Sequence, residues 1–235
     1  MDARFRSQYG ATVKGSREAV AVWGAVILGL GAIEVLGLAV PFLHSIVGAL
    51  AVAAFLYVPV RYLERRGQDA RDAGWRFDRL KADLALSLGT CAVVLPLFAV
   101  AFFVFTAWLD QLPAALRTLL APYRGSAHLR MPALTLDLAG QVAGNAAVAF
   151  AEEFFYRGYM TLRFEEEWTP LKSALVAAAL FALGHLLEPA PWRLAVFFPA
   201  LWFAWLRSRT GTVVGASIAH FLSNVWLLLL ERSAY

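Results

Sequence analysis

The sequence predicts an all-α, polytopic membrane protein, a bundle of seven to eight transmembrane helices that forms one domain over residues 1–235. Composition is the first reason: 60% of the residues are hydrophobic and 16% are charged, whereas roughly a quarter are charged in soluble domains. The second reason is that several apolar runs approach the length of about 20 residues that a spanning helix needs. The net charge of +4 comes largely from Arg residues near helix ends, so we expect the lipid bilayer as a partner and no nucleic acid.

Hydropathy places seven apolar spans along the chain. They cover residues 20–40, 42–60, 84–108, 138–160, 171–187, 193–206 and 212–230. Segment 111–121 is mildly amphipathic, so it fits either an interfacial helix or part of an eighth span. The first span is too long for a signal peptide and lacks a small-residue cleavage site, and we expect the mature protein to retain it.

The distribution of Lys and Arg predicts the orientation, because positively charged links tend to stay in the cytoplasm. With alternating spans, 16 of these residues fall on the side of the polar segment 1–19 and the basic link 61–81, and 5 fall on the other side. We therefore expect a cytoplasmic N-terminus and a C-terminus on the opposite side. Richness in Ala, Leu and Arg indicates a bacterium with a high-GC genome, and hence the bacterial cytoplasmic (inner) membrane.

The stretch from Phe150 to Tyr159 places Glu152, Glu153 and Arg157 inside an apolar span. Charges there are costly, and in membrane proteins they usually serve a function. Glu153 and Arg157 are four residues apart, so they lie on one helix face and can form an ion pair. Glu152 is turned by about 100° from that face and lacks this partner, which makes it the better candidate for a general base.

Counting residues from a turn predicts that another polar side chain reaches the depth of Glu152. A helix over residues 137–168 ends at a turn at Thr169, which Pro170 favours. Glu152 lies 17 residues before Thr169 and His185 lies 16 residues after it. Both side chains are therefore expected about 25 Å from that turn.

A second turn near Thr210-Gly211 is expected on the same side of the membrane, at the start of the last span. His220 and Asn224 follow Thr210 by 10 and 14 residues, or about 15 and 21 Å. They are four residues apart and present two hydrogen-bonding groups to one point, as an oxyanion site requires. The four polar groups are therefore expected near one plane inside the membrane, about 15 Å below the cytoplasmic surface.

Three motifs occur in order along the second half of the chain. They are Glu152-Glu153-xxx-Arg157, Phe181-xxx-His185 and His220-xxx-Asn224. This ordered set resembles the signature of the CPBP family, also called the Abi or CAAX prenyl protease type II family, whose members are glutamic-type intramembrane proteases. The resemblance covers roughly residues 138–230, which we expect to form the catalytic core, and it leaves out the first two spans and the basic link.

The resemblance implies a role for each motif residue. In this family the first glutamate and the histidine of the second motif activate a water molecule, and the histidine and asparagine of the third motif stabilise the oxyanion. The second glutamate and the arginine support the site. Carried over to this chain, these roles fall on Glu152 with His185, on His220 with Asn224, and on Glu153 with Arg157. The resemblance implies no cofactor and no metal.

The predicted activity is hydrolysis of a peptide bond in a membrane-associated peptide or protein, for example a lipidated chain or a C-terminal sorting tail. Three alternatives stay open. His185, His220 and a glutamate are a competent ligand set for a zinc metalloprotease, although no HExxH motif occurs. The second alternative is a non-catalytic membrane protein of the bacteriocin-immunity type. A proton-coupled transporter is the third, and its expected inverted repeat is missing from the sequence.

Other polar residues have simpler interpretations. Glu34, in the first span, is expected to contact a neighbouring helix or the lipid interface. His44 and His128 are expected to be incidental. The charge run 165–167 consists of three glutamates and is typical of a solvated helix end.

The aromatic stretch 197–205 is more typical of lipid-facing or core packing than of a substrate site. Pro199 within it is a candidate for a helix kink. The single cysteine, Cys91, lies in an apolar run, so the chain can form neither an internal disulfide nor a cysteine-based metal site.

Overall fold

The computed structural model describes residues 14–120, 135–187 and 191–233, and every regular element within these ranges is a helix. The all-α prediction is therefore confirmed. In chain order the elements are α1 (Gly15–Gly37), α2 (Pro41–Glu64), α3 (Leu80–Leu109), α4 (Ala114–Leu120), α5 (Leu136–Glu153), η2 (Phe154–Met160), α6 (Thr161–Glu165), α7 (Pro170–Gly184), η3 (His185–Leu187), η4 (Pro191–Val196), α8 (Phe197–Thr210) and α9 (Val214–Ser233). The N-terminal residues 1–13, the loop 123–130 and its His128 lie outside the described residues.

Four helical stretches are long and apolar enough to cross a membrane, namely α1, α2, α3 and Pro170–Leu187. Val214–Leu230, most of α9, is a shorter apolar helix. The short helix α4 has seven residues, about 10 Å in length, so by itself it cannot cross a hydrocarbon core of about 30 Å. The protein is thus a polytopic integral membrane protein. The predicted number of seven to eight spans stays a prediction.

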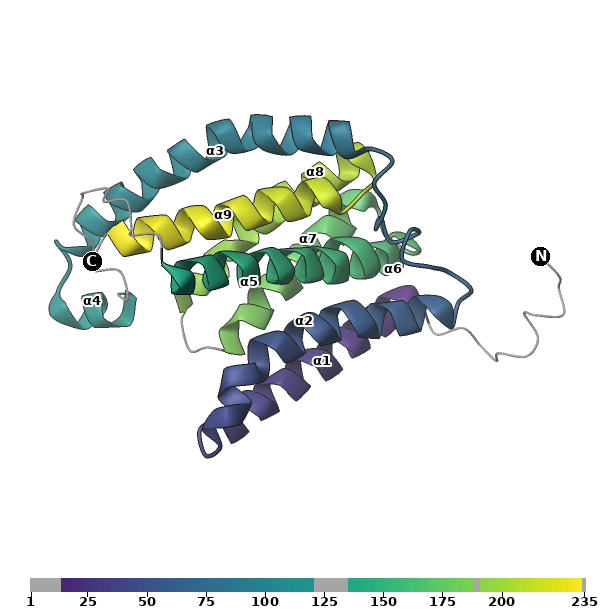
Figure 1. Ribbon diagram of the computed structural model, residues 1–235, viewed down its shortest axis with the longest axis horizontal. Coiled ribbons are helices and arrows are strands. Elements are labelled where there is room, and N and C mark those ends of the chain that lie inside the picture. Colours follow the sequence, from purple (N-terminus) through teal and green to yellow (C-terminus); the bar gives the residue numbers. More distant parts are fainter. Residues whose placement is uncertain (1–13, 121–134, 188–190, 234–235) are drawn as a thin grey trace, which may run out of the picture.

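The helices that carry the polar motifs lie in the middle of the bundle (Figure 1). α9 packs between α3 and α5, and α2 packs against the other side of α5. α1 pairs with α2 as a hairpin, while α7 pairs with α8, which also contacts α9. The helices of Glu152 and His220, α5 and α9, are therefore flanked on both sides by other helices.

The long helix predicted over residues 137–168 is present, but its hydrogen bonding changes in the middle. Thr135 caps α5 with its side-chain oxygen. Directly after Glu153 the backbone adopts a π-helix over Phe154–Met160. The helix then continues without a break into α6. Short π-helical turns inside α-helices are rare and frequently lie at functional sites. All seven residues of this π segment are buried, including Arg157.

Both predicted turns are confirmed. Thr169 caps α7 by accepting a hydrogen bond from the Lys172 N–H (3.4 Å), and Pro170 occupies the first helical position. Gly211 ends α8 with a φ of 73°, a left-handed conformation that glycine adopts without steric cost. These turns fix how far His185 and His220 stand from the ends of their helices.

The basic link between α2 and α3 is folded onto the helices of the polar motifs. The Gly74 carbonyl accepts a hydrogen bond from the Val213 N–H (3.0 Å), just before α9. The Trp75 ring contacts the rings of Phe150 and Phe154, with centroid distances of 4.9 and 5.2 Å. The basic link, which lies outside the region of resemblance, therefore packs against α5, the helix that carries Glu152.

Two further interpretations from the sequence are wrong. Pro199 does not kink α8, because the helix begins at Phe197 and the proline stands in the first turn, where its missing N–H breaks no helical hydrogen bond. His44 is not incidental, because its Nδ1 lies 2.9 Å from Glu34 Oε1 and the pair joins α1 to α2. The same pair confirms the inter-helix contact expected of Glu34.

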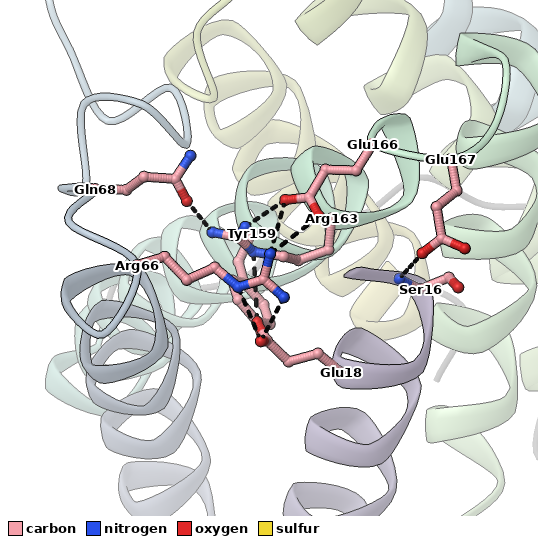
Figure 2. Close-up of polar contacts among 8 residues, drawn as sticks. All are labelled: Ser16, Glu18, Arg66, Gln68, Tyr159, Arg163, Glu166 and Glu167. Carbon is pink, nitrogen blue, oxygen red and sulfur yellow. Dashed lines mark hydrogen bonds and ion pairs between the residues drawn. The ribbon is translucent and has the colours of Figure 1, made fainter. Parts of the chain in front are cut away.

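The charge run 165–167 is more than a solvated helix end. Each of its glutamates contacts a different element through a side chain or backbone N–H group (Figure 2 draws the last two). Glu165 accepts from Arg207 on α8 (3.1 Å), Glu166 from Arg66 after α2 (3.1 Å), and Glu167 from the Ser16 N–H on α1 (2.9 Å). Three exposed or half-exposed carboxylates therefore attach three elements to the end of α6.

Candidate active site

The candidate site begins with the two glutamates that end α5. Glu153 accepts a hydrogen bond from Arg157 Nη1 (2.9 Å), and their side chains are 0% and 1% exposed. The ion pair predicted from the four-residue spacing is therefore present. The Arg157 guanidinium also lies over the rings of Phe181 and Phe203, 4.5 and 5.5 Å from their centroids. A charge that is costly in an apolar interior is thus compensated by an ion pair and by aromatic faces.

His220 on α9 connects the two glutamates. Its Nδ1 donates to Glu153 Oε1 (2.8 Å), and its Nε2 lies 3.6 Å from Glu152 Oε2. The imidazole stacks on the Phe203 ring, with centroids 4.8 Å apart and an interplanar angle of 16°. One buried ring, with 6% of its side chain exposed, therefore faces both carboxylates in a fixed orientation.

His185 is the first residue after α7. Its Nδ1 lies 2.9 Å from the Phe181 carbonyl oxygen, and because a carbonyl only accepts, this nitrogen is the donor. In the neutral ring, Nε2 is then left as the acceptor. The Phe181 ring lies between the two imidazoles, 4.6 Å from that of His185 and 5.9 Å from that of His220.

A cavity of about 210 Å³ opens beside Glu152 and His185. Its polar lining also includes Tyr156 from the π segment and Arg193 from η4. Its remaining lining residues are Ile27, Leu30, Ala51, Phe55, Gly184 and Leu187. Since a water molecule occupies about 30 Å³ in the liquid, this space admits several water molecules or part of a peptide next to the Glu152 carboxylate.

The described contacts unite most of the site residues expected from the sequence. Glu152 and Glu153 meet His220 directly, and His185 shares the cavity with Glu152. No described contact links His185 to Glu152, although the resemblance implies that they act together. Asn224 stands one turn beyond His220 on α9 and is half-buried, and no hydrogen bond joins its amide to another described residue.

Three residues around the site were missed from the sequence. Arg193, at the start of the predicted span 193–206, is one of the five basic residues that the alternating spans place on the side opposite the N-terminus, and yet it lines the cavity. Tyr156 was passed over because nothing in its spacing marks it. Phe203 could have been found, because it lies seven residues before Thr210 and His220 lies ten residues after it, so a hairpin brings them near one depth.

Within the described ranges, no group of three or more His, Cys, Asp or Glu side chains is arranged to hold a metal ion. The site therefore combines a small cavity, lined by Glu152, His185 and Arg193, with the buried side chains of Glu153, Arg157 and His220 next to it. This arrangement can take a proton from a water molecule at Glu152 and compensate negative charge from His220.

Residues 135–226 match the model of a family described as type II CAAX prenyl endopeptidase Rce1-like. This segment is similar to the Rce1-like family. It contains all six residues expected at the site, and it begins after α4, so α1, α2 and α3 lie outside the matched region. No curated protein and no solved structure matches the chain. The Rce1-like match and the apolar helices together support a CAAX-type intramembrane endopeptidase, a hydrolase that acts on a membrane-associated protein.

Proposed function

We propose that this Rce1-like protein is a glutamic-type protease in which Glu152 is the general base. The proposal rests on the position of Glu152. Its side chain lines the cavity and also lies 3.6 Å from His220 Nε2. A water molecule in the cavity can then reach the carboxylate. The water oxygen attacks the peptide carbonyl carbon, Glu152 takes the water proton, and the same proton passes to the leaving amine.

The two histidines have different roles in this mechanism. His185 is held by its bond to the Phe181 carbonyl, which leaves Nε2 free to accept a hydrogen bond from the attacking water and so to orient it. His220 already donates from Nδ1 to Glu153, so it can donate to an oxyanion only from a protonated Nε2. We assign Asn224, one turn further along α9, as the second oxyanion donor on the resemblance alone.

Glu153 and Arg157 support the site rather than take part in proton transfer. Glu153 orients His220 through the 2.8 Å hydrogen bond to Nδ1, and Arg157 neutralises Glu153. A carboxylate that orients a histidine in this way fixes which nitrogen faces the substrate. Glu152 keeps no hydrogen bond to Arg157 among the described contacts, consistent with its role as the base.

We further propose that the substrate is a membrane-anchored protein tail, either lipidated or a C-terminal sorting tail. The description of the matching family as CAAX prenyl endopeptidases supports a lipidated tail. The Lys and Arg distribution supports a cytoplasmic N-terminus, which would place the substrate at the cytoplasmic side of a bacterial inner membrane. No cofactor is needed for this chemistry.

The test compares membrane peptide profiles of cells that express the wild-type chain or Glu152→Gln. We expect the product peptides to fall by a factor of about 10² or more in the variant, because proton transfer contributes 10²- to 10⁴-fold to catalysis. Glu64→Gln is the matched control, since Glu64 is exposed and pairs only with Arg61 on its own helix. Unchanged products in Glu152→Gln would overturn the proposal, and loss of products after chelation would favour a metal mechanism instead.

A further inference from the structure

One wall of the cavity comes from outside the segment that matches the Rce1-like family. Ile27 and Leu30 on α1 and Ala51 and Phe55 on α2 face Glu152 and His185 across the cavity. All four are apolar, whereas the opposite wall carries the polar groups. The shape of the space beside Glu152 therefore depends on where the α1–α2 hairpin lies.

The hairpin is attached to the matched segment mainly toward one of its ends. The Phe55 ring contacts the rings of Phe155 and Tyr156 on the π segment, at centroid distances of 4.9 and 5.8 Å. From there toward the α1–α2 turn, the hairpin diverges from α5 (Figure 1). Near that turn its side chains include exposed apolar groups such as Leu36 and Phe42, which are 57% and 68% exposed. The position of the hairpin therefore depends on its apolar packing around Phe55 and on the contacts at the other end.

A carboxylate in the first turn of α1 holds this other end (Figure 2). Glu18 Oε2 accepts from Arg66 Nε and Nη2, at 3.0 and 2.8 Å, and Glu18 Oε1 accepts from the Tyr159 hydroxyl at 2.9 Å. Arg163 Nε lies 3.5 Å from the same Oε1. One side chain thus joins α1, the residues that follow α2, the π segment and α6.

The two arginines extend this cluster. Arg66 also donates to Glu166 (3.1 Å), and Arg163, only 1% exposed, hydrogen-bonds to Glu166 and to Gln68. Burial alone would lower the pKa of Arg66, but the hydrogen bonds and charges of Glu18 and Glu166 outweigh it and raise the pKa. We name these side chains the Glu18 latch: Glu18, Arg66, Gln68, Tyr159, Arg163 and Glu166.

The latch is connected to the cavity by rigid helix on both sides. On α1, Ile27 follows Glu18 by nine residues, about 14 Å along the axis. On the matched side, Tyr159 of the latch and Tyr156 of the cavity belong to the same buried π segment. Exposed isolated ion pairs contribute little to stability, but here the Glu18 side chain is 13% exposed and takes part in several bonds at once.

We propose that Glu18 is a positioning residue, which with Arg66 and Arg163 holds the α1–α2 hairpin as the substrate-facing wall of the cavity. This inference rests on the proposed function, because the wall meets a substrate only if the cavity beside Glu152 is the active site. Loss of the Glu18 charge frees the hairpin at its attached end. The apolar wall then moves relative to Glu152, and the bound peptide is held less well.

The first test measures the position of the hairpin and needs no substrate. Spin labels are placed at Leu36Cys on α1 and Leu183Cys on α7 in a Cys91→Ser background, both positions being exposed. The distance between the two spin labels is measured in lipid nanodiscs for this protein and for its Glu18→Gln variant. We expect a longer and broader distance distribution in the variant, and no change in the Glu64→Gln control. Unchanged distances in Glu18→Gln overturn the proposal.

The second test uses the substrate found by the peptide profiles. In Glu18→Gln we expect KM to rise about tenfold with kcat within about twofold, because binding rather than proton transfer is affected. A purely structural role would instead lower the amount of active protein and leave KM unchanged, which also overturns the proposal. Arg66→Lys keeps the charge but not the paired N–H groups, so its KM is expected between those of the wild type and Glu18→Gln. If Glu152→Gln stays active, the proposed mechanism is wrong. The spin-label distances still test the latch in that case, because they do not depend on activity.

Discussion

The protein contains two clusters of glutamate and arginine, one in the middle of the bundle and one at its end. In the central cluster, Glu153 and Arg157 are almost fully buried, and Glu153 Oε2 and Arg157 Nη2 have no hydrogen-bond partner among the described residues. In the Glu18 latch, both carboxylate oxygens of Glu18 accept hydrogen bonds. Residue types are shared, but the central cluster directly follows Glu152, which lines the cavity, whereas the described lining of that cavity includes no residue of the latch.

The difference separates two uses of charge in a membrane protein. Buried polar atoms that lack partners are costly, and in membrane proteins such groups usually mark functional sites. The latch contains such an atom as well, Arg163 Nε, but its Glu18 carboxylate is paired through both oxygens and connects helices at the end of the bundle. Each prediction below alters one carboxylate or its partner and asks which use applies.

The largest effect is expected for Arg157→Leu, which leaves Glu153 buried without its arginine. Breaking a buried pair from one side costs about 3 to 5 kcal/mol, so we expect a large drop in the thermal midpoint in detergent. The double variant Glu153→Gln with Arg157→Leu removes the stranded charge and is expected to recover much of the loss. Arg66→Leu in the latch, 22% exposed, is expected to cost much less than Arg157→Leu. Equal losses for the two arginines would remove the distinction between the clusters.

A smaller effect is expected at Asp83, a buried carboxylate on α3. Both of its oxygens lie 2.8 Å from Thr212 Oγ1, in the turn before α9. Asp83→Ala should lower stability by about 1.5 to 3 kcal/mol, the range for a hydrogen bond to a charged group. Thr212→Val should add little in the Asp83→Ala background, and fully additive losses would show that the two side chains are not coupled. Asp78→Ala is the control, because Asp78 is 59% exposed.

The smallest effect is expected at Glu167, which is fully exposed. The Ser16 N–H holds the pKa of this carboxyl below its usual range. Since the folded-state pKa is lowered, its contribution to stability is present at neutral pH and is lost as the pH falls through that lowered pKa. The thermal midpoint of Glu167→Gln should therefore lie below that of the wild type at pH 6, and the two should converge near pH 3. A difference that persists at pH 3 would point to another cause.

Local spacing explains which parts of the site the sequence predicted. The Glu153–Arg157 pair depends only on a four-residue separation within one helix, and the depth of His220 depends only on counting from Gly211. Contacts across the bundle depend on how each helix is rotated, which spacing alone does not determine. For that reason the 2.8 Å hydrogen bond from His220 to Glu153 was not predicted, and neither was the position of Arg193 at the cavity.

The charge run 165–167 shows the same limit. It was interpreted from its own helix, where three consecutive carboxylates favour solvent. Its partners Arg207, Arg66 and Ser16 stand 42, 100 and 151 residues away in the sequence. The seven predicted spans fall largely on helical residues because hydropathy is a local property. The attachments of the charge run, by contrast, become visible only when the chain is folded.

The π segment has a consequence for how this chain tolerates insertions and deletions. Its backbone hydrogen bonds close over five residues rather than four, so Phe154–Met160 carries surplus backbone between Glu153 and Arg163. Deleting one residue there would remove this surplus and leave the rotation of the following residues nearly unchanged, whereas converting the segment to ordinary α-helix at its present length would rotate everything beyond it by about 100°. Arg163 would then move away from Glu18 although neither side chain had changed. The π segment therefore sets how the latch residue Arg163 is rotated about the helix axis relative to Glu152.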